Sequence, residues 1–288
     1  MLKLENKTIT ASFSAKGAEL QSVYNKETQQ EYLWEGDPTF WGKFSPILFP
    51  IVGGLKGNTY LFNDQKYELP RHGFARDLVF EVEKSSNHEI TFLLKHDPYT
   101  LSVYPFEFEL RLHYELTETG LRCSYRVYNP ANEPLLFSIG GHPAFAIHVN
   151  ADLKYEDYYL SFNRDEQLVY HKINQNLIDD ETLTIPLQEG TLPLKHELFY
   201  EDALVFKSLK SNMIRIKNKN NNQGLDFSFD SFPFFGIWAA RDANFVCLEP
   251  WCGIADGIHH DQQLTEKEGI ISLSGDEHWS RSWEISTY

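Results

Sequence analysis

Two residues, His142 and Glu249, combine a side chain that can transfer protons with a restrained backbone. Glu249 follows the apolar run Phe245–Leu248, which is typical of a buried strand, and we expect that strand to stop at Pro250. His142 follows two glycines in the segment Ser138–Phe145. Each of the two residues directly precedes a proline, which restricts the preceding backbone to extended conformations. A carboxylate and an imidazole fixed in this way form a candidate catalytic pair.

The pair suits one reaction in particular, the opening of a cyclic hemiacetal. A proton must leave the anomeric hydroxyl and another must reach the ring oxygen, and a carboxylate and a histidine can do both in concert. At reference pKa values of about 4.3 and 6.5, Glu249 is ionised at neutral pH and His142 can carry the proton. Trp251 adds an aromatic wall that suits the C–H face of a pyranose. The ordinary alternatives are a solvated acid at a strand end and a core histidine.

Other polar clusters are less specific. Arg71, His72 and Arg76 lie around a glycine just after a predicted strand, and they offer directional donors for hydroxyl or phosphate oxygens. Equally, these three residues could be ordinary charged residues at the point where the chain leaves a hairpin. His259 and His260 are adjacent, so on extended backbone they point to opposite sides. We therefore interpret the segment 255–261 as a polar loop and predict no metal site.

The elements that would position these residues are strands. Apolar and polar residues alternate strictly over Phe106–Glu115, which indicates an antiparallel strand with one wet face, and the alternation returns over Arg122–Tyr128. A tight hairpin is predicted over 59–69, and one short helical turn over 98–104. We expect one all-β domain of many antiparallel strands over residues 1–288. Further strands are predicted at 8–13, 20–24, 78–83, 89–94, 135–139, 158–162, 204–206, 213–217, 225–229, 235–239, 270–273 and 279–285.

Composition restricts the possible partners. The 288 residues carry a formal net charge of −15, which disfavours nucleic acid and anionic membranes but leaves room for a local basic pocket. Three cysteines form neither a disulfide framework nor a zinc-binding pattern, so a reducing compartment is expected. No signal-peptide pattern or apolar run of about 18 residues is present, and we expect a cytoplasmic protein. The oligomeric state stays open.

The order of three motifs resembles a known family. Residues 71–76 read Arg-His-Gly-Phe-Ala-Arg, residues 140–145 read Gly-Gly-His-Pro-Ala-Phe, and residues 248–251 read Leu-Glu-Pro-Trp. This series is similar to the aldose 1-epimerase (galactose mutarotase-like) family, and to its LacX-type branch in particular, which residues 253–256 and 266–270 also match.

The resemblance implies a galactose mutarotase-like β-supersandwich and no cofactor or metal. It implies His142 as the general acid at the ring oxygen and Glu249 as the general base at the anomeric hydroxyl. It further implies that His72 holds sugar hydroxyls with Arg76 nearby. Arg71, Trp251 and Phe235 complete the set of predicted substrate-binding residues.

One position departs from the branch, because Gly54 stands where an arginine is expected. Lys43, Lys56 or Arg71 are candidates to replace it, and Asp242 is a candidate for a substrate-binding aspartate. The leading hypothesis is an isomerase that interconverts the anomers of an aldohexose of the galactose or glucose type. The alternatives are a hexose-6-phosphate 1-epimerase, a noncatalytic carbohydrate-binding protein and, less favoured, a glycoside-processing enzyme.

Overall fold

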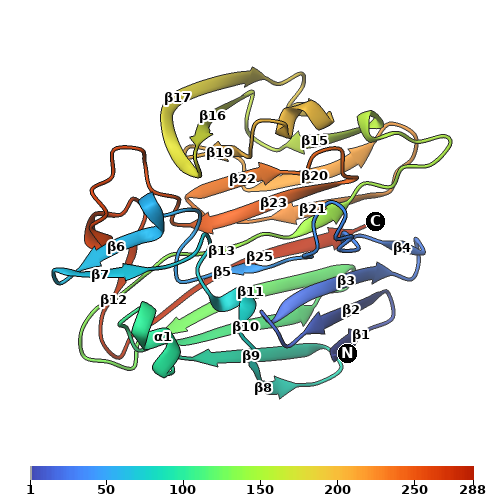
Figure 1. Ribbon diagram of the computed structural model, residues 1–288. Coiled ribbons are helices and arrows are strands. Elements are labelled where there is room, and N and C mark those ends of the chain that lie inside the picture. Colours follow the sequence, from blue (N-terminus) through green and yellow to red (C-terminus); the bar gives the residue numbers. More distant parts are fainter. Residues whose placement is uncertain (1) are drawn as a thin grey trace.

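The computed structural model describes residues 2–288, and most of them form antiparallel strands (Figure 1). A nine-stranded sheet has the order β18-β15-β20-β21-β25-β11-β10-β9-β8. Its strands span Thr191–Pro193, Tyr158–Phe162, Met213–Asn218, Gly224–Ser228, His278–Thr287, Gly120–Tyr128, Glu109–Leu116, Glu89–Lys95 and Glu81–Ser85 in that order. The all-β prediction is confirmed.

An eight-stranded sheet has the order β17-β16-β19-β22-β23-β13-β5, with β14 also paired to β23. Its strands span Leu177–Pro186, Gln167–Asn174, Leu204–Phe206, Phe234–Trp238, Phe245–Cys252, Ile139–Gly141, Ile47–Leu48 and, for β14, Ala144–Ala146. The two large sheets pack together through aromatic rings, because Phe227 of β21 contacts both Phe145 of β14 and Phe235 of β22. One face of the eight-stranded sheet therefore lies in the core, and the other is free to carry a site.

Smaller elements complete the fold. Four strands form an N-terminal sheet, and two further pairs, the β6–β7 hairpin and β12 with β24, stand apart from the large sheets. These strands are β1 Leu2–Glu5, β2 Ile9–Ser14, β3 Glu19–Asn25, β4 Gln30–Glu31, β6 Thr59–Phe62, β7 Gln65–Glu68, β12 Leu135–Phe137 and β24 Ile271–Leu273. The short α1 spans Pro98–Val103, as predicted, and 3-10 turns span Lys56–Asn58, Ala75–Asp77, Tyr155–Asp157, His196–Phe199 and Leu264–Glu266. None of the helices within residues 2–288 has the length and apolar character needed to cross a membrane.

The burial pattern of the alternating segment 106–115 is as predicted, but the strand begins later than predicted. Strand β10 begins at Glu109, three residues after the alternation starts, and its inward side chains are buried. Phe106 and Phe108 lie before the strand yet remain buried in the core. Periodicity thus identified the face of the segment, whereas strand pairing decided where the hydrogen-bonded ladder begins.

Strand β23 is longer than predicted, and the expected stop at Pro250 is wrong. All eight of its residues are buried, and Pro250 stays in register with Phe235 of β22. On the other side, β14 pairs with β23 up to Cys247 and β13 pairs with it from Trp251. The ladder on that side skips Leu248, Glu249 and Pro250, so the missing N–H of the proline falls in a gap between two pairings.

A hairpin made of β16 and β17 was missed altogether by the sequence analysis. The β17 strand is largely exposed and carries several charged residues, so it shows no clear apolar alternation. The two strands pair antiparallel around the turn residues Gln175 and Asn176. This hairpin forms one edge of the eight-stranded sheet, and it contributes a wall to the site described next.

Candidate active site

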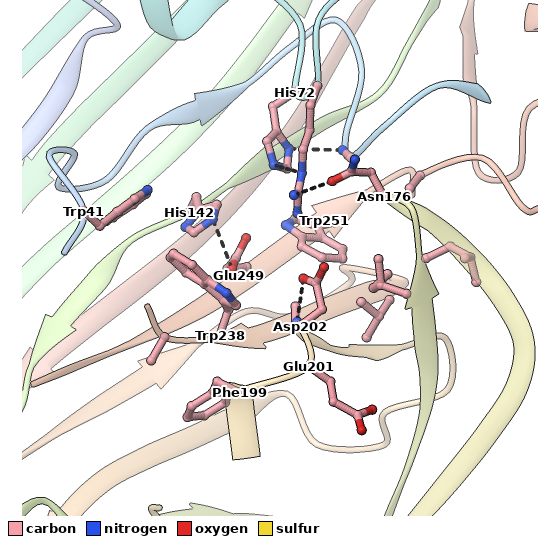
Figure 2. A pocket seen from close by; sticks show the side chains of 18 of the residues that line it. Trp41, His72, His142, Asn176, Phe199, Glu201, Asp202, Trp238, Glu249 and Trp251 are labelled. Carbon is pink, nitrogen blue, oxygen red and sulfur yellow. Dashed lines mark hydrogen bonds and ion pairs between the residues drawn. The ribbon is translucent and has the colours of Figure 1, made fainter. Parts of the chain in front are cut away.

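A cavity of about 430 Å³ lies over β22 and β23, on the face of the eight-stranded sheet that is turned away from the core (Figure 2). A volume in this range is typical of small-molecule sites and leaves room for a ligand of monosaccharide size. Its walls come from the β16–β17 hairpin, from the segment after it and from the loops that carry Trp41, Gly53 and Arg71.

The structure brings His142 and Glu249 together at the base of this cavity. His142 Nε2 lies 3.4 Å from Glu249 Oε1, and their side chains are only 10% and 2% exposed. Glu249 is presented by β23, at the gap in its ladder, and His142 lies in the break between β13 and β14. The two residues that precede prolines therefore face each other across the same irregularity in the sheet.

Burial changes the protonation expected from reference values. Loss of water raises the pKa of Glu249 well above its usual value, although the positive charge of Arg71 opposes this effect. Loss of water, assisted by Arg71, lowers the pKa of His142 to about 3. Burial thus favours a protonated carboxyl beside a neutral imidazole. This form holds the same single proton as a carboxylate–imidazolium pair, so the two groups titrate as one unit.

A third potential ligand atom lies beside the pair. His142, Cys247 and Glu249 each place a donor atom within 4.8 Å of the others, and no other such group of three was found in residues 2–288. Burial raises the pKa of the Cys247 thiol well above its usual value, with the carboxyl of Glu249 as a second cause. Because metal ions bind the thiolate, this environment opposes the third ligand.

His72 and Arg71 lie beside the pair, and the His72 ring meets the ring of His142 edge-on, with centroids 5.9 Å apart. The His72 ring is buried, and its Nδ1 accepts a hydrogen bond from the backbone N–H of Gly53 at 3.1 Å. Nε–H of Arg71 is directed at Nε2 of the ring, 3.2 Å away. Burial, followed by the charge of Arg71, lowers the pKa of His72 well below its usual value. The ring is therefore neutral at physiological pH.

Arg76 also lines the cavity, and the backbone of Arg71 holds its guanidinium in place. Its Nη2 donates to the backbone carbonyl of Arg71 at 2.8 Å, while its buried Nε makes no hydrogen bond and lies 3.7 Å from Oδ2 of Asp77. Of the three residues considered as replacements for an arginine at position 54, only Arg71 lines the cavity. Lys43 is directed to Asp77, and Lys56 donates to the carbonyl of His260.

Trp251 forms part of the floor because two glycines leave space for its ring. A Cβ atom on Gly140 would lie 2.6 Å from Cδ1 of the indole, and one on Gly236 would lie 2.5 Å from its Cζ2. Both glycines are on strands that flank Trp251 in the sheet. The indole therefore lies flat across its neighbours, and it lines the cavity as predicted.

Phe235 does not line the cavity, and the prediction that it forms a wall is wrong. It is buried on the core face, where its ring packs against Phe229 with the two ring centroids 4.2 Å apart. Gly236 is in register with Glu249 and Trp238 with Cys247, so the alternation along β22 turns Phe235 to the other side. Trp238, three residues further along, provides the wall instead.

Several cavity residues were not identified from the sequence. Trp41 stacks on the imidazole of His142, while Trp238 meets the same ring edge-on. Asn176, Asp202 and Arg241 also line the cavity. Asp242 does not line it, and its carboxylate accepts a hydrogen bond from the hydroxyl of Tyr200. A tryptophan in the polar, turn-rich segment 35–43 was a usable signal for Trp41.

The adjacent histidines of the segment 255–261 have separate partners. His259 is exposed and faces Asp180, whereas His260 is nearly buried and faces Asp256. Asp256 also forms a buried ion pair with Lys267, with Oδ1 and Nζ 2.7 Å apart. The two adjacent histidines thus point in different directions. Ala255 lines the cavity, whereas Asp256 supports the loop around Gly54 through a hydrogen bond from its N–H to the Gly54 carbonyl.

Comparison with known proteins agrees with this architecture. The sequence model of the aldose 1-epimerase family matches residues 1–282. The plasmid and chromosomal LacX proteins of Lactococcus lactis subsp. lactis are each 31% identical over 295 residues, which covers 99% of this chain and 98% of the relative.

Solved structures give the same result. A galactose mutarotase related enzyme from Lactobacillus acidophilus superposes with a TM-score of 0.95 at 34% identity, covering 100% of this chain and 97% of the other. A galactose mutarotase-like protein from Lactobacillus casei ATCC 334 superposes with a TM-score of 0.92 at 29% identity, covering 100% of both chains. The fold is therefore the galactose mutarotase-like β-supersandwich, and the chain belongs to the aldose 1-epimerase family.

Proposed function

We propose that this protein is an aldose 1-epimerase that interconverts the α and β anomers of an aldohexose. The observation that carries the proposal is the contact between His142 and Glu249, an acid–base pair buried at the base of a cavity of monosaccharide size. The indoles of Trp41, Trp238 and Trp251 supply apolar walls for the C–H groups of a pyranose. Family membership supports a sugar as the substrate.

The reaction follows from one proton held by the pair. Moving this proton from Glu249 to His142 across the 3.4 Å contact gives a carboxylate and an imidazolium. Glu249 then removes the proton of the anomeric hydroxyl while His142 protonates the ring oxygen, and the C1–O5 bond breaks to give the open-chain aldehyde. Rotation about C1–C2 presents the other carbonyl face. Reclosure returns both protons and yields the other anomer.

Polarimetry or exchange NMR on freshly dissolved α-glucose and α-galactose tests the proposal. The wild-type protein is expected to accelerate anomer interconversion over the uncatalysed rate in the same buffer. An unchanged rate for these sugars and for their 6-phosphates contradicts it. Binding by calorimetry without any acceleration supports the noncatalytic alternative.

One observation favours the 6-phosphates as a second candidate substrate class. Arg71, Arg76 and Arg241 all line the cavity, and arginine is well suited to phosphate oxygens. Glu201 and Asp202 line the same cavity, and their negative charges oppose a phosphate placed near them. We therefore favour free sugars, and the relative kcat/KM for glucose and glucose 6-phosphate decides between the two classes.

A further inference from the structure

The tip of the β16–β17 hairpin occupies the place that an arginine at position 54 was expected to fill. Gln175 and Asn176 have φ angles of +50° and +68°, the two-residue turn geometry that suits a tight hairpin. A Cβ atom on Gly54 would lie 2.8 Å from the backbone oxygen of Asn176 and 3.1 Å from its Cβ. A side chain at position 54 and the hairpin tip therefore exclude each other.

Asn176 uses this place to hold Arg71. Its Oδ1 accepts a hydrogen bond from Nη1 of Arg71 at 2.9 Å, and Nε–H of the same guanidinium is directed at Nε2 of His72, 3.2 Å away (Figure 2). Asn176 and His72 thus hold Nη1 and Nε of Arg71, and the N–H groups of Nη2 remain for a ligand in the cavity that Arg71 lines.

We propose that Asn176 is a positioning residue that fixes Arg71, so that Arg71 offers the N–H groups of its Nη2 to one oxygen of the sugar. Gly54 provides the space through which the hairpin tip reaches Arg71. This inference rests on the proposed function, since it names the residues that hold the substrate of that reaction.

The position of Arg71 also matters for the acid–base pair. Its charge is the main influence that opposes the raised pKa of Glu249, and after burial it is the largest cause of the lowered pKa of His142. If Arg71 moves away, the pKa of Glu249 rises further, because its carboxylate loses a favourable charge. The acidic limb of the pH profile of kcat/KM then moves to higher pH.

Asn176→Gly is the direct test, because glycine adopts a positive φ readily and keeps the turn. The lost hydrogen bond is exposed, so KM is expected to rise about three- to tenfold with little change in kcat. In an Arg71→Ala background the same substitution is expected to have no further effect, since Asn176 acts through Arg71. Gly54→Ala is expected to raise KM similarly, because its Cβ displaces the hairpin tip.

Two matched controls separate positioning from a loosened hairpin. Gln175→Gly alters the same turn without touching Arg71. Gly257→Ala adds a Cβ whose nearest neighbour, the carbonyl of Ile178 in the same hairpin, is at an ordinary 3.9 Å. Both variants are expected to keep the KM and the pH profile of the wild type.

The proposal is overturned if Asn176→Gly keeps the wild-type KM and pH profile, if its effect adds fully to that of Arg71→Ala, or if Gln175→Gly reproduces it. Failure of the proposed function has a different signature, namely a wild type that accelerates no sugar. In that case calorimetry with glucose and galactose decides the role of Asn176. A weaker Kd for Asn176→Gly supports positioning, whereas an equal Kd, or no binding by the wild type, overturns it.

Discussion

The indole of Trp41 stacks on the imidazole of His142, with ring centroids 4.9 Å apart and ring planes inclined by 27°. Trp238 meets the same imidazole edge-on at 5.5 Å, so two aromatic rings fix its plane. The Nδ1 atom of His142 is buried and has no hydrogen-bond partner, so no polar contact at that atom orients the ring. Apart from the contact of Nε2 with Glu249, orientation of the proposed general acid therefore depends on packing against neighbouring rings.

Replacing Trp41 should consequently impair turnover. An aromatic pair contributes about 0.5–1.5 kcal/mol, so Trp41→Ala is expected to lower kcat roughly two- to tenfold, while Trp41→Phe keeps most of the activity. Phe40→Ala is the control, because Phe40 is partly exposed and contacts Trp34 rather than His142. A Trp41→Ala variant with the wild-type kcat, measured by polarimetry, contradicts this role.

The two halves of the acid–base pair should be individually essential. His142→Gln and Glu249→Gln are each expected to lower kcat by roughly 10²–10⁴, the usual contribution of general acid–base catalysis. Both variants should still fold, as judged by circular dichroism. Full activity in either variant means that the role given to that residue is wrong.

The Glu249→Gln variant should also differ in stability. The folded-state pKa of Glu249 lies above its unfolded value of 4.5, so its contribution to stability is complete below pH 4.5 and is lost as the pH rises. Glutamine is neutral at every pH and escapes this loss. The free energy of urea unfolding of Glu249→Gln is therefore expected to rise relative to that of the wild type between pH 4.5 and 8. If the difference between the two proteins is the same at every pH, the prediction is wrong.

The buried histidines should give stability the opposite pH dependence, so that stability falls as the pH is lowered. The pKa of His142 is lowered to about 3, and that of His72 also lies well below 6.5. Their contribution to stability is complete above pH 6.5 and is lost as the pH falls below it. The wild type therefore loses up to about 1.4 kcal/mol per pH unit for each histidine. His142→Gln is expected to show a shallower fall in Tm than the wild type, whereas the exposed control His88→Gln shows the same fall.

The glycines beneath Trp251 should resist enlargement. Gly236→Ala places a Cβ 2.5 Å from Cζ2 of the indole, so it is expected to cost about 1–3 kcal/mol of stability and to raise KM. Adding Trp251→Phe removes the part of the ring that clashes, and it should restore stability but not sugar affinity. Thermal unfolding and calorimetry measure the two effects separately. If Gly236→Ala alone leaves both unchanged, the indole does not depend on this space.

The buried pair of Lys267 and Asp256 should be important for folding. Both side chains are 1% exposed, and Asp256 also accepts from the backbone N–H of Lys56 beside Gly54. Lys267→Met removes the lysine partner of the buried Asp256 carboxylate and is expected to cost about 3–5 kcal/mol in urea unfolding. Adding Asp256→Asn should recover part of this loss. The more exposed pair of Lys207 and Glu268 is the control, and Lys207→Met is expected to cost at most about 1 kcal/mol.

Much of the fold could be predicted because its signals are local. The alternation over residues 106–115 depends only on the two-residue period of a strand, and it identified the buried face of β10 correctly. The tight hairpin of β6 and β7 and the short α1 were confirmed for the same reason. The exposed β16–β17 hairpin has no such pattern, so only its pairing in the folded sheet reveals it.

The sequence by itself determined the chemistry available at the site. It identified His142 and Glu249, the restraint that the following prolines place on both, and the cluster around His72, because residue type and local backbone restraint do not depend on distant contacts. It could not assign protonation, since the pKa directions of the pair arise from burial and from Arg71.

Only the tertiary structure decided which side chains share the cavity. Strand register turned Trp238 toward it and Phe235 into the core, since adjacent residues on a strand face opposite sides. The gap between β13 and β14 placed His142 against Glu249, and the hairpin tip filled the space above Gly54. These outcomes depend on contacts between segments far apart in the chain, which no local pattern encodes.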